Sequence, residues 1–97
     1  MAVLIQYEGF VASATSRVYN FQVTDSPGKS RQFTVTIQLE AFRTALFKFQ
    51  DGPDICFARL KRELDEETQD SYAKPHLNIG EQDIQQYSQR HPRQRRL

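Results

Sequence analysis

Two stretches of the chain alternate between apolar and polar residues, as strands with one buried face do. The apolar positions are Tyr19, Phe21 and Val23 in the first stretch and Phe33, Val35, Ile37 and Leu39 in the second. Between them, Pro27 and Gly28 favour a tight turn, because proline fixes φ and glycine permits positive φ. The pattern therefore predicts an antiparallel β-hairpin over residues 17–39.

The segments on either side of this hairpin carry weaker patterns. Residues 3–8 alternate and predict another strand, which ends at Gly9 and leads into a loop over residues 12–16. Residues 40–50 fit either a helical face or a short strand, and periodicity alone cannot decide between the two in so short a segment. Their Phe and Thr content favours a turn followed by a short strand at 45–50.

The sequence Asp-Gly-Pro-Asp at 51–54 is typical of a helix start, with a capping residue, an early proline and an acidic first turn. An apolar stripe at helical spacing follows, made of Ile55, Cys56, Phe57, Leu60 and Leu64. The charged residues on the other side are expected to face water, and they are Arg59, Lys61, Arg62 and Glu63. The pattern predicts a main helix over about 53–67 that covers the apolar face of the hairpin.

A second helix is predicted over about 81–90, after a polar connecting loop at 68–78 that contains Pro75. Gly80 would cap this helix, and Ile79 and Ile84 occupy the two positions of a hydrophobic staple. Its apolar stripe consists only of Ile84 and Tyr87. The helix is therefore expected to pack peripherally or to complete its burial against a partner.

Together these elements predict an α+β fold: a small antiparallel sheet of three to four strands with the main helix on one face. At 97 residues the chain has room for one hydrophobic core, so we expect a single domain over 1–89 and a basic, flexible tail over 90–97. The longest apolar run, residues 1–5, is far shorter than the ~20 residues of a membrane-spanning helix. A single cysteine fits a reducing compartment, and the cytoplasm is the expected location.

Few residues point to catalysis, metal binding or a cofactor. Cys56 lies in the first turn of the main helix, where a thiol can become reactive, but its apolar neighbours favour a packing role. The only histidines available as a base are His76 and His91, and neither lies in a motif. Asp51 and Asp54 fit a helix start better than a carboxylate pair or a metal site. We therefore predict no enzyme activity, no cofactor and no metal.

The charge distribution is more suggestive. All twelve acidic residues lie within residues 1–89 together with nine basic ones, whereas the tail contains Arg90, Arg93, Arg95 and Arg96. Three interpretations stay open: a solvated terminus, binding to an acidic partner (including the acidic run at 63–70), and binding to nucleic acid phosphates.

The polar face of the hairpin carries no charge and includes Thr34, Thr36 and Gln38. Such a face is either solvated or free to pair with another chain at its edge. With Ile84 and Tyr87, these residues are the candidate interface, and Thr36→Lys is predicted to disrupt self-association. The sequence thus predicts a non-enzymatic protein–protein interaction module that self-associates, with nucleic-acid binding through the Arg-rich tail as the alternative.

Overall fold

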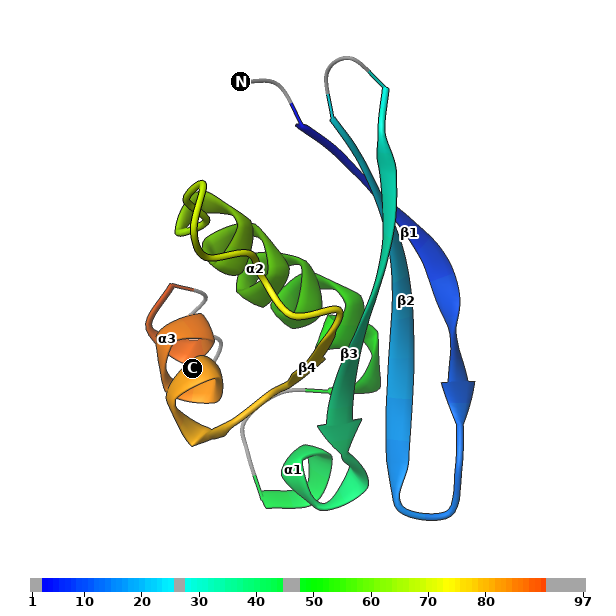
Figure 1. Ribbon diagram of the computed structural model, residues 1–97. Helices are drawn as coiled ribbons and strands as arrows, with labels where there is room; N and C mark the ends of the chain where they lie inside the picture. Colours follow the sequence, from blue (N-terminus) through cyan, green and yellow to red (C-terminus); the bar gives the residue numbers. More distant parts are fainter. Residues whose placement is uncertain (1–2, 26–27, 45–47, 91–97) are drawn as a thin grey trace.

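The structure, a computed structural model, describes residues 3–25, 28–44 and 48–90 (Figure 1). The elements follow one another as β1 (Val3–Ala12), β2 (Ser16–Asp25), β3 (Ser30–Gln38), α1 (Leu39–Thr44), the 3-10 turn η1 (Phe49–Asp51), α2 (Gly52–Asp65), β4 (His76–Asn78) and α3 (Glu81–Arg90). The four strands form one sheet in the order β1-β2-β3-β4. The fold class is α+β, as the sequence predicts.

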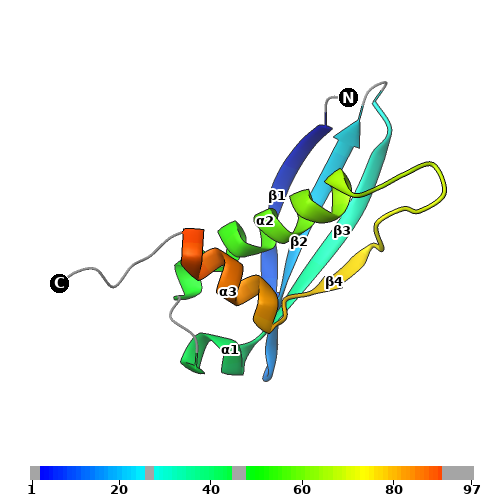
Figure 2. The same ribbon diagram turned by 90° about the vertical axis from the view of Figure 1, so that its left-hand side faces the viewer.

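The predicted hairpin is confirmed and supplies half of the core. β2 and β3 pair antiparallel, with Phe21 opposite Phe33 and Tyr19 opposite Val35. The apolar positions of both strands are at most 1% exposed. They face α2, which crosses this side of the sheet (Figure 2) and contributes Ile55, Cys56 and Leu60 to the same core. The predicted main helix is therefore confirmed, with bounds that differ by two residues or fewer.

The sheet is mixed rather than purely antiparallel, which corrects the sequence prediction. Within the predicted connecting loop at 68–78, residues 76–78 form β4 and pair parallel to β3, with Leu77 opposite Val35. The Thr34 amide donates to the carbonyl of Pro75 at 2.8 Å, and the Ile79 amide donates to the carbonyl of Thr36 at 2.9 Å. A strand of three residues is too short to show alternation, so this pairing has no pattern in the sequence.

Residues 40–50 also differ from the prediction. Helix α1 extends to Thr44, and the chain from Phe49 onward is the 3-10 turn η1, so no strand includes the described residues 48–50. Residues 45–47 lie outside the described residues. The 3-10 turn is closed by Asp51, whose Oδ2 accepts a hydrogen bond from the Lys48 amide at 2.9 Å. Asp51 also stands at the N-cap of α2.

Helix α3 has the predicted bounds and packs on α2 (Figure 2). Ile79 is buried and Ile84 packs against the core, as the predicted staple requires. The Ile84 amide donates to the carbonyl of Gly80 at 3.2 Å, which starts the helix. None of the helices among the described residues is long and apolar enough to span a membrane.

The connection from α2 to β4 is held by Glu67. Its carboxylate accepts two hydrogen bonds from Arg31 on β3, at 2.8 Å from Nη1 and 3.1 Å from Nη2. It also accepts the Ala73 amide at 2.7 Å. These contacts, led by the Arg31 hydrogen bond, lower the pKa of Glu67 below its ordinary value of 4.5.

We expect Glu67→Gln to reduce the pH dependence of stability. A carboxyl with a lowered pKa stabilises the fold above its ordinary pKa, and this contribution is lost as the pH falls through the lowered value. The variant should be less stable than the wild type by up to about 1 kcal/mol near pH 7, by urea denaturation. This difference should shrink as the pH falls below the ordinary pKa of 4.5. Glu66→Gln, at an exposed neighbour, is the control. A difference that does not shrink on acidification would contradict the role of the charge.

Candidate functional site

β1 is a free edge of the sheet, and it concentrates exposed apolar side chains. It is ten residues long and, among the described strands, pairs only with β2. Among the described residues, eight large hydrophobic side chains are exposed, and five of them are on β1: Val3, Leu4, Tyr7, Phe10 and Val11. An edge strand with unpaired backbone groups and apolar side chains is a template for pairing with another strand.

The pairing register shows which side of the sheet these residues occupy. Val3 and Tyr7 lie opposite Asp25 and Phe21, on the side that bears α2. A register shift between Tyr7 and Gly9 then places Phe10 opposite Tyr19 on the same side. Figure 2 shows that α2 crosses this side of the sheet diagonally, and α2 contacts β1 as well as β2 and β3. It nevertheless leaves the side chains of Val3, Tyr7 and Phe10 more than 40% exposed.

The aromatic rings of β1 pack against aromatic rings of the core. The Tyr7 ring centroid is 5.4 Å from that of Phe21, and the Phe10 centroid is 5.5 Å from that of Tyr19. The guanidinium of Arg17 lies between two rings, 4.4 Å from the Phe10 centroid and 4.0 Å from the Phe49 centroid. Exposed tyrosine, phenylalanine and arginine are the residue types enriched where proteins bind one another.

Natural edge strands usually contain features that prevent pairing with another strand, such as charged residues and bulges. In β1 these features occur only in the middle of the strand, at Glu8 and Gly9. Its single charged residue is Glu8, and Gly9 adopts φ 115° in the bulge. Glu8 Oε1 accepts a hydrogen bond from Gln32 Nε2 at 2.7 Å across the sheet face opposite α2. Bulges and charges both hinder edge pairing. Residues 3–7 therefore remain as a regular, uncharged segment without proline.

The predicted interface on β3 has a different environment. Thr34 and Thr36 are half-buried and Gln38 is exposed, on the sheet face opposite α2. The edge of β3 beside the two threonines is already paired with β4, and Thr34 Oγ1 is hydrogen-bonded to His76 Nδ1 at 2.7 Å. The free edge that the sequence placed on the hairpin is therefore on β1.

The other two predicted interface residues pack within the chain. Tyr87 is 6% exposed, and its hydroxyl donates to Asp51 Oδ1 at 3.4 Å. Ile84 is half-buried against the same core. Both apolar residues of α3 therefore contribute to docking the helix on its own domain. Whether the helix also meets a partner stays a prediction.

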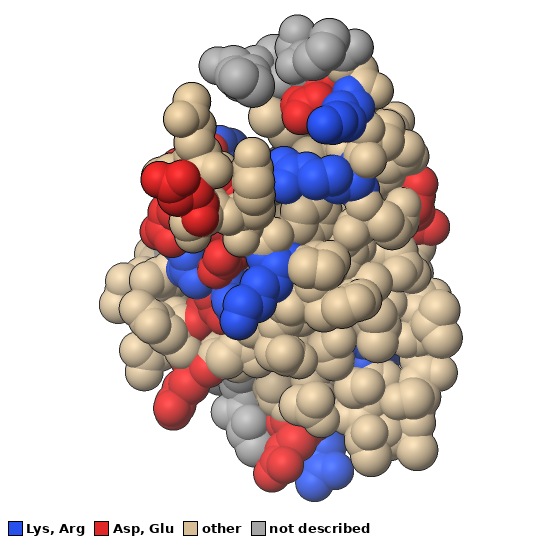
Figure 3. All heavy atoms as spheres, in the orientation of Figure 1, with Lys and Arg blue, Asp and Glu red and all other residues tan. Residues whose placement is uncertain are grey.

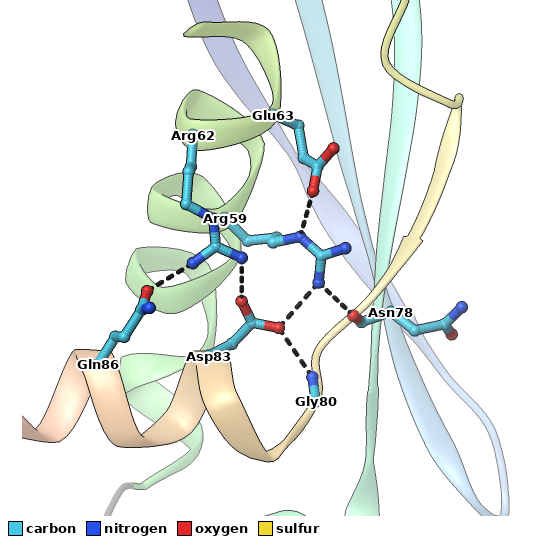
Figure 4. A network of polar contacts seen from close by, with 7 residues as sticks. All are labelled: Arg59, Arg62, Glu63, Asn78, Gly80, Asp83 and Gln86. Carbon is cyan, nitrogen blue, oxygen red and sulfur yellow. Dashed lines mark hydrogen bonds and ion pairs between the residues drawn. The ribbon is translucent and has the colours of Figure 1, made fainter. Parts of the chain in front are cut away.

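Asp83 anchors α3 to α2 and was not singled out by the sequence (Figure 4). Its carboxylate is 6% exposed and accepts Arg59 Nη1 at 2.8 Å and Arg62 Nη2 at 2.7 Å. The same carboxylate accepts the Gly80 amide at 2.9 Å, as a capping residue does. Arg59 and Arg62 are thus bound to α3, which corrects the expectation that both face water. The sequence signal for this contact is that Asp83 stands three positions after Gly80, the residue expected to cap the helix.

A hollow of about 350 Å³ lies between α2 and α3, lined by residues that include Lys61, Arg62, Asp65 and Gln86. Its charges already pair, because Lys61 Nζ is 3.3 Å from Asp65 Oδ2 and Arg62 Nη1 donates to Gln86 Oε1 at 2.5 Å. Figure 3 shows acidic and basic side chains interspersed over this region and a broad area of the sheet without either. The hollow thus offers a charged ligand little unpaired charge.

The candidate catalytic and metal-binding residues are separated by the fold. Cys56 is fully buried in the core. Asp51 is buried while Asp54 is exposed on the first turn of α2. No group of three or more metal-ligating side chains occurs among residues 3–25, 28–44 and 48–90.

The thiol of Cys56 is expected to be unreactive in the native protein. Burial, and secondarily the negative charge of Asp83, raise its pKa well above the ordinary value of 9.0, and the thiolate is the reactive form. Reaction with a mild disulfide reagent should be at least about 100-fold slower in the native protein than in urea. Fast stoichiometric labelling of the native protein would contradict this placement and favour a nucleophilic role.

The Arg-rich tail lies mostly outside the described residues. Arg90 ends α3, and Arg93, Arg95 and Arg96 follow beyond the described chain. Several members of the acidic run at 63–70 already have partners: Glu63 with Arg59, Asp65 with Lys61 and Glu67 with Arg31. The three interpretations of the tail stay predictions.

Comparisons of this chain with protein families, with curated proteins and with solved structures find no match. The function of the surface around β1 can therefore be inferred only from its own residues. Its apolar residues are visible in the sequence, but alternation does not reveal that β1 is an edge strand or that several of its apolar side chains are exposed.

Proposed function

We propose that this chain is a non-enzymatic protein–protein interaction module of a reducing compartment, and that its binding element is the free edge of β1. A partner strand would extend the sheet by hydrogen bonding to this edge, with affinity from the backbone and specificity from alternate side chains. The observation that supports the proposal most is the concentration of five of the eight exposed large hydrophobic side chains on this one strand.

The surroundings of β1 add further support. The rings of Tyr7 and Phe10 are held by Phe21 and Tyr19 beneath them, so an incoming strand would meet preorganised side chains and lose little entropy in ordering them. The opposite edge is weaker as a binding element, because β4 has only three residues.

The nucleic-acid alternative gains no support from the folded part of the chain. Arg31, Arg59 and Arg62 all pair with carboxylates, so their charge is less available to phosphates. That hypothesis rests on the tail sequence alone. It predicts a salt-sensitive excess of 260 nm absorbance in the purified protein.

Strand addition can be tested with a fluorescent peptide that reproduces residues 2–8. We expect the peptide to bind the wild-type protein saturably, as measured by anisotropy. A control peptide with the same side chains but N-methylated amides at Leu4, Ile5 and Gln6 should bind at least about tenfold more weakly, because it cannot donate to the edge. Equal binding of the two peptides, or no binding of either, would contradict the proposal.

A further inference from the structure

We infer that the partner strand is β1 of a second copy of this chain, and that the two copies pair antiparallel around a two-fold axis at Ile5. The inference rests on the proposed function, since it names what the free edge binds. Two-fold symmetry lets both copies use the same surface, so the chain needs no second binding element.

The side chains of residues 3–7 are complementary to themselves in this register. On the α2 side, Val3 of each copy lies opposite Tyr7 of the other, and both are 43% exposed in the single chain. A pair between a β-branched and an aromatic residue is among the favourable cross-strand pairs. On the opposite side, Leu4 of each copy lies opposite Gln6.

The charges of the strand permit this register. Glu8 is the only charged residue of β1, and two-fold pairing at Ile5 places the two Glu8 residues at opposite ends of the paired segment. They are then separated by six residues along the strand direction, or about 20 Å. At that distance their repulsion is largely screened at physiological salt. Glu8 is also held over its own sheet by Gln32.

The bulge sets the length of the pairing. After Tyr7 the register shifts, and a bulge bends and twists the strand beyond it. Pairing is therefore confined to residues 3–7. Its two-fold axis stands perpendicular to the sheet, so the α2 helices of both copies lie on the same side of one continuous sheet.

The size of this contact predicts a weak dimer. A five-residue edge segment with these side chains buries on the order of 400 Å² per copy, at the low end for specific interfaces. We therefore expect a dissociation constant on the order of 10 µM. At protein concentrations near this value, monomer and dimer would both be present and would exchange.

Charge substitutions on the outer side of the strand test the inference by sedimentation equilibrium. The variant Leu4→Lys/Gln6→Lys places like charges opposite each other twice and should weaken dimerisation at least about tenfold. The variant Leu4→Glu/Gln6→Glu should do the same. An equimolar mixture of the two should recover the dimer, because opposite charges then face each other, and this recovery also shows that both variants fold.

The matched control is Thr36→Lys/Gln38→Lys, which adds two lysines at the same spacing on the same sheet face but away from β1. The sequence alone predicted that Thr36→Lys disrupts self-association, but the β3 edge beside Thr36 is paired with β4. The control should therefore dimerise like the wild type. A wild-type protein that stays monomeric above about 200 µM, a dimer unaffected by the β1 charges, or one lost in the control would overturn the inference. If the monomer still binds the peptide of residues 2–8, strand addition stands and only the identity of the partner is wrong.

Discussion

Gly52→Ala is expected to lower the free energy of unfolding by about 2–3 kcal/mol, the range for overpacking a close-packed site. Gly52 begins α2 directly against Tyr19, and a Cβ at this position would stand 2.6 Å from Tyr19 Cζ and closer still to the hydroxyl. Tyr19 is fully buried and lies under Phe10, so its ring has little room to shift.

The control is Gly80→Ala, at the start of α3. There the nearest neighbour of an added Cβ is Asp83 Oδ2 at 3.9 Å, an ordinary contact. Gly80→Ala should therefore cost less than about 1 kcal/mol. Urea denaturation of both variants measures the difference. Equal stability of the two would show that α2 does not approach β2 as closely as the structure has it.

Asp83→Ala is expected to destabilise the protein by about 2–4 kcal/mol. The substitution removes the carboxylate that Arg59 and Arg62 share and the acceptor of the Gly80 amide (Figure 4). Breaking a fully buried ion pair costs about 3–5 kcal/mol. Part of that cost is avoided here, because the Arg62 side chain is 36% exposed and can be hydrated.

Glu81→Ala is the matched control for this prediction, because Glu81 lies in the same first turn of α3 and is exposed. It should change stability by less than about 0.5 kcal/mol. Hydrogen exchange should show that Asp83→Ala loosens α3 more than the hairpin. A variant as stable as the control would contradict the anchoring role of Asp83.

The sequence predicts the parts of this fold that depend on local patterns. The hairpin follows from strict alternation around Pro27 and Gly28, and both long helices follow from capping residues and apolar stripes. β4 could not be found in this way, because its only buried residue is Leu77 and its pairing with β3 joins segments some forty residues apart. The Asp83 anchor likewise joins side chains on two helices, and no spacing along the chain encodes such a contact.

The sequence and the structure place the free edge of the sheet on different strands. An uncharged, β-rich edge was expected on the hairpin, yet parallel pairing with β4 covers that edge and leaves β1 free. Apolar residues at 3–7 are equally compatible with a covered strand and an exposed one. Only the three-dimensional arrangement decides between the two: α2 crosses the sheet diagonally (Figure 2) but leaves Val3, Tyr7 and Phe10 more than 40% exposed.

The most direct test of the account is amide hydrogen exchange of β1 at low and high protein concentration. The account predicts that alternate amides within residues 3–7, those that point away from β2, gain protection as the concentration rises through the dissociation constant. Amides of β4, at the other edge, should not change. If the mass of the protein doubles from 11.3 kDa while exchange in β1 stays constant, the chain associates through another surface and the central claim is wrong.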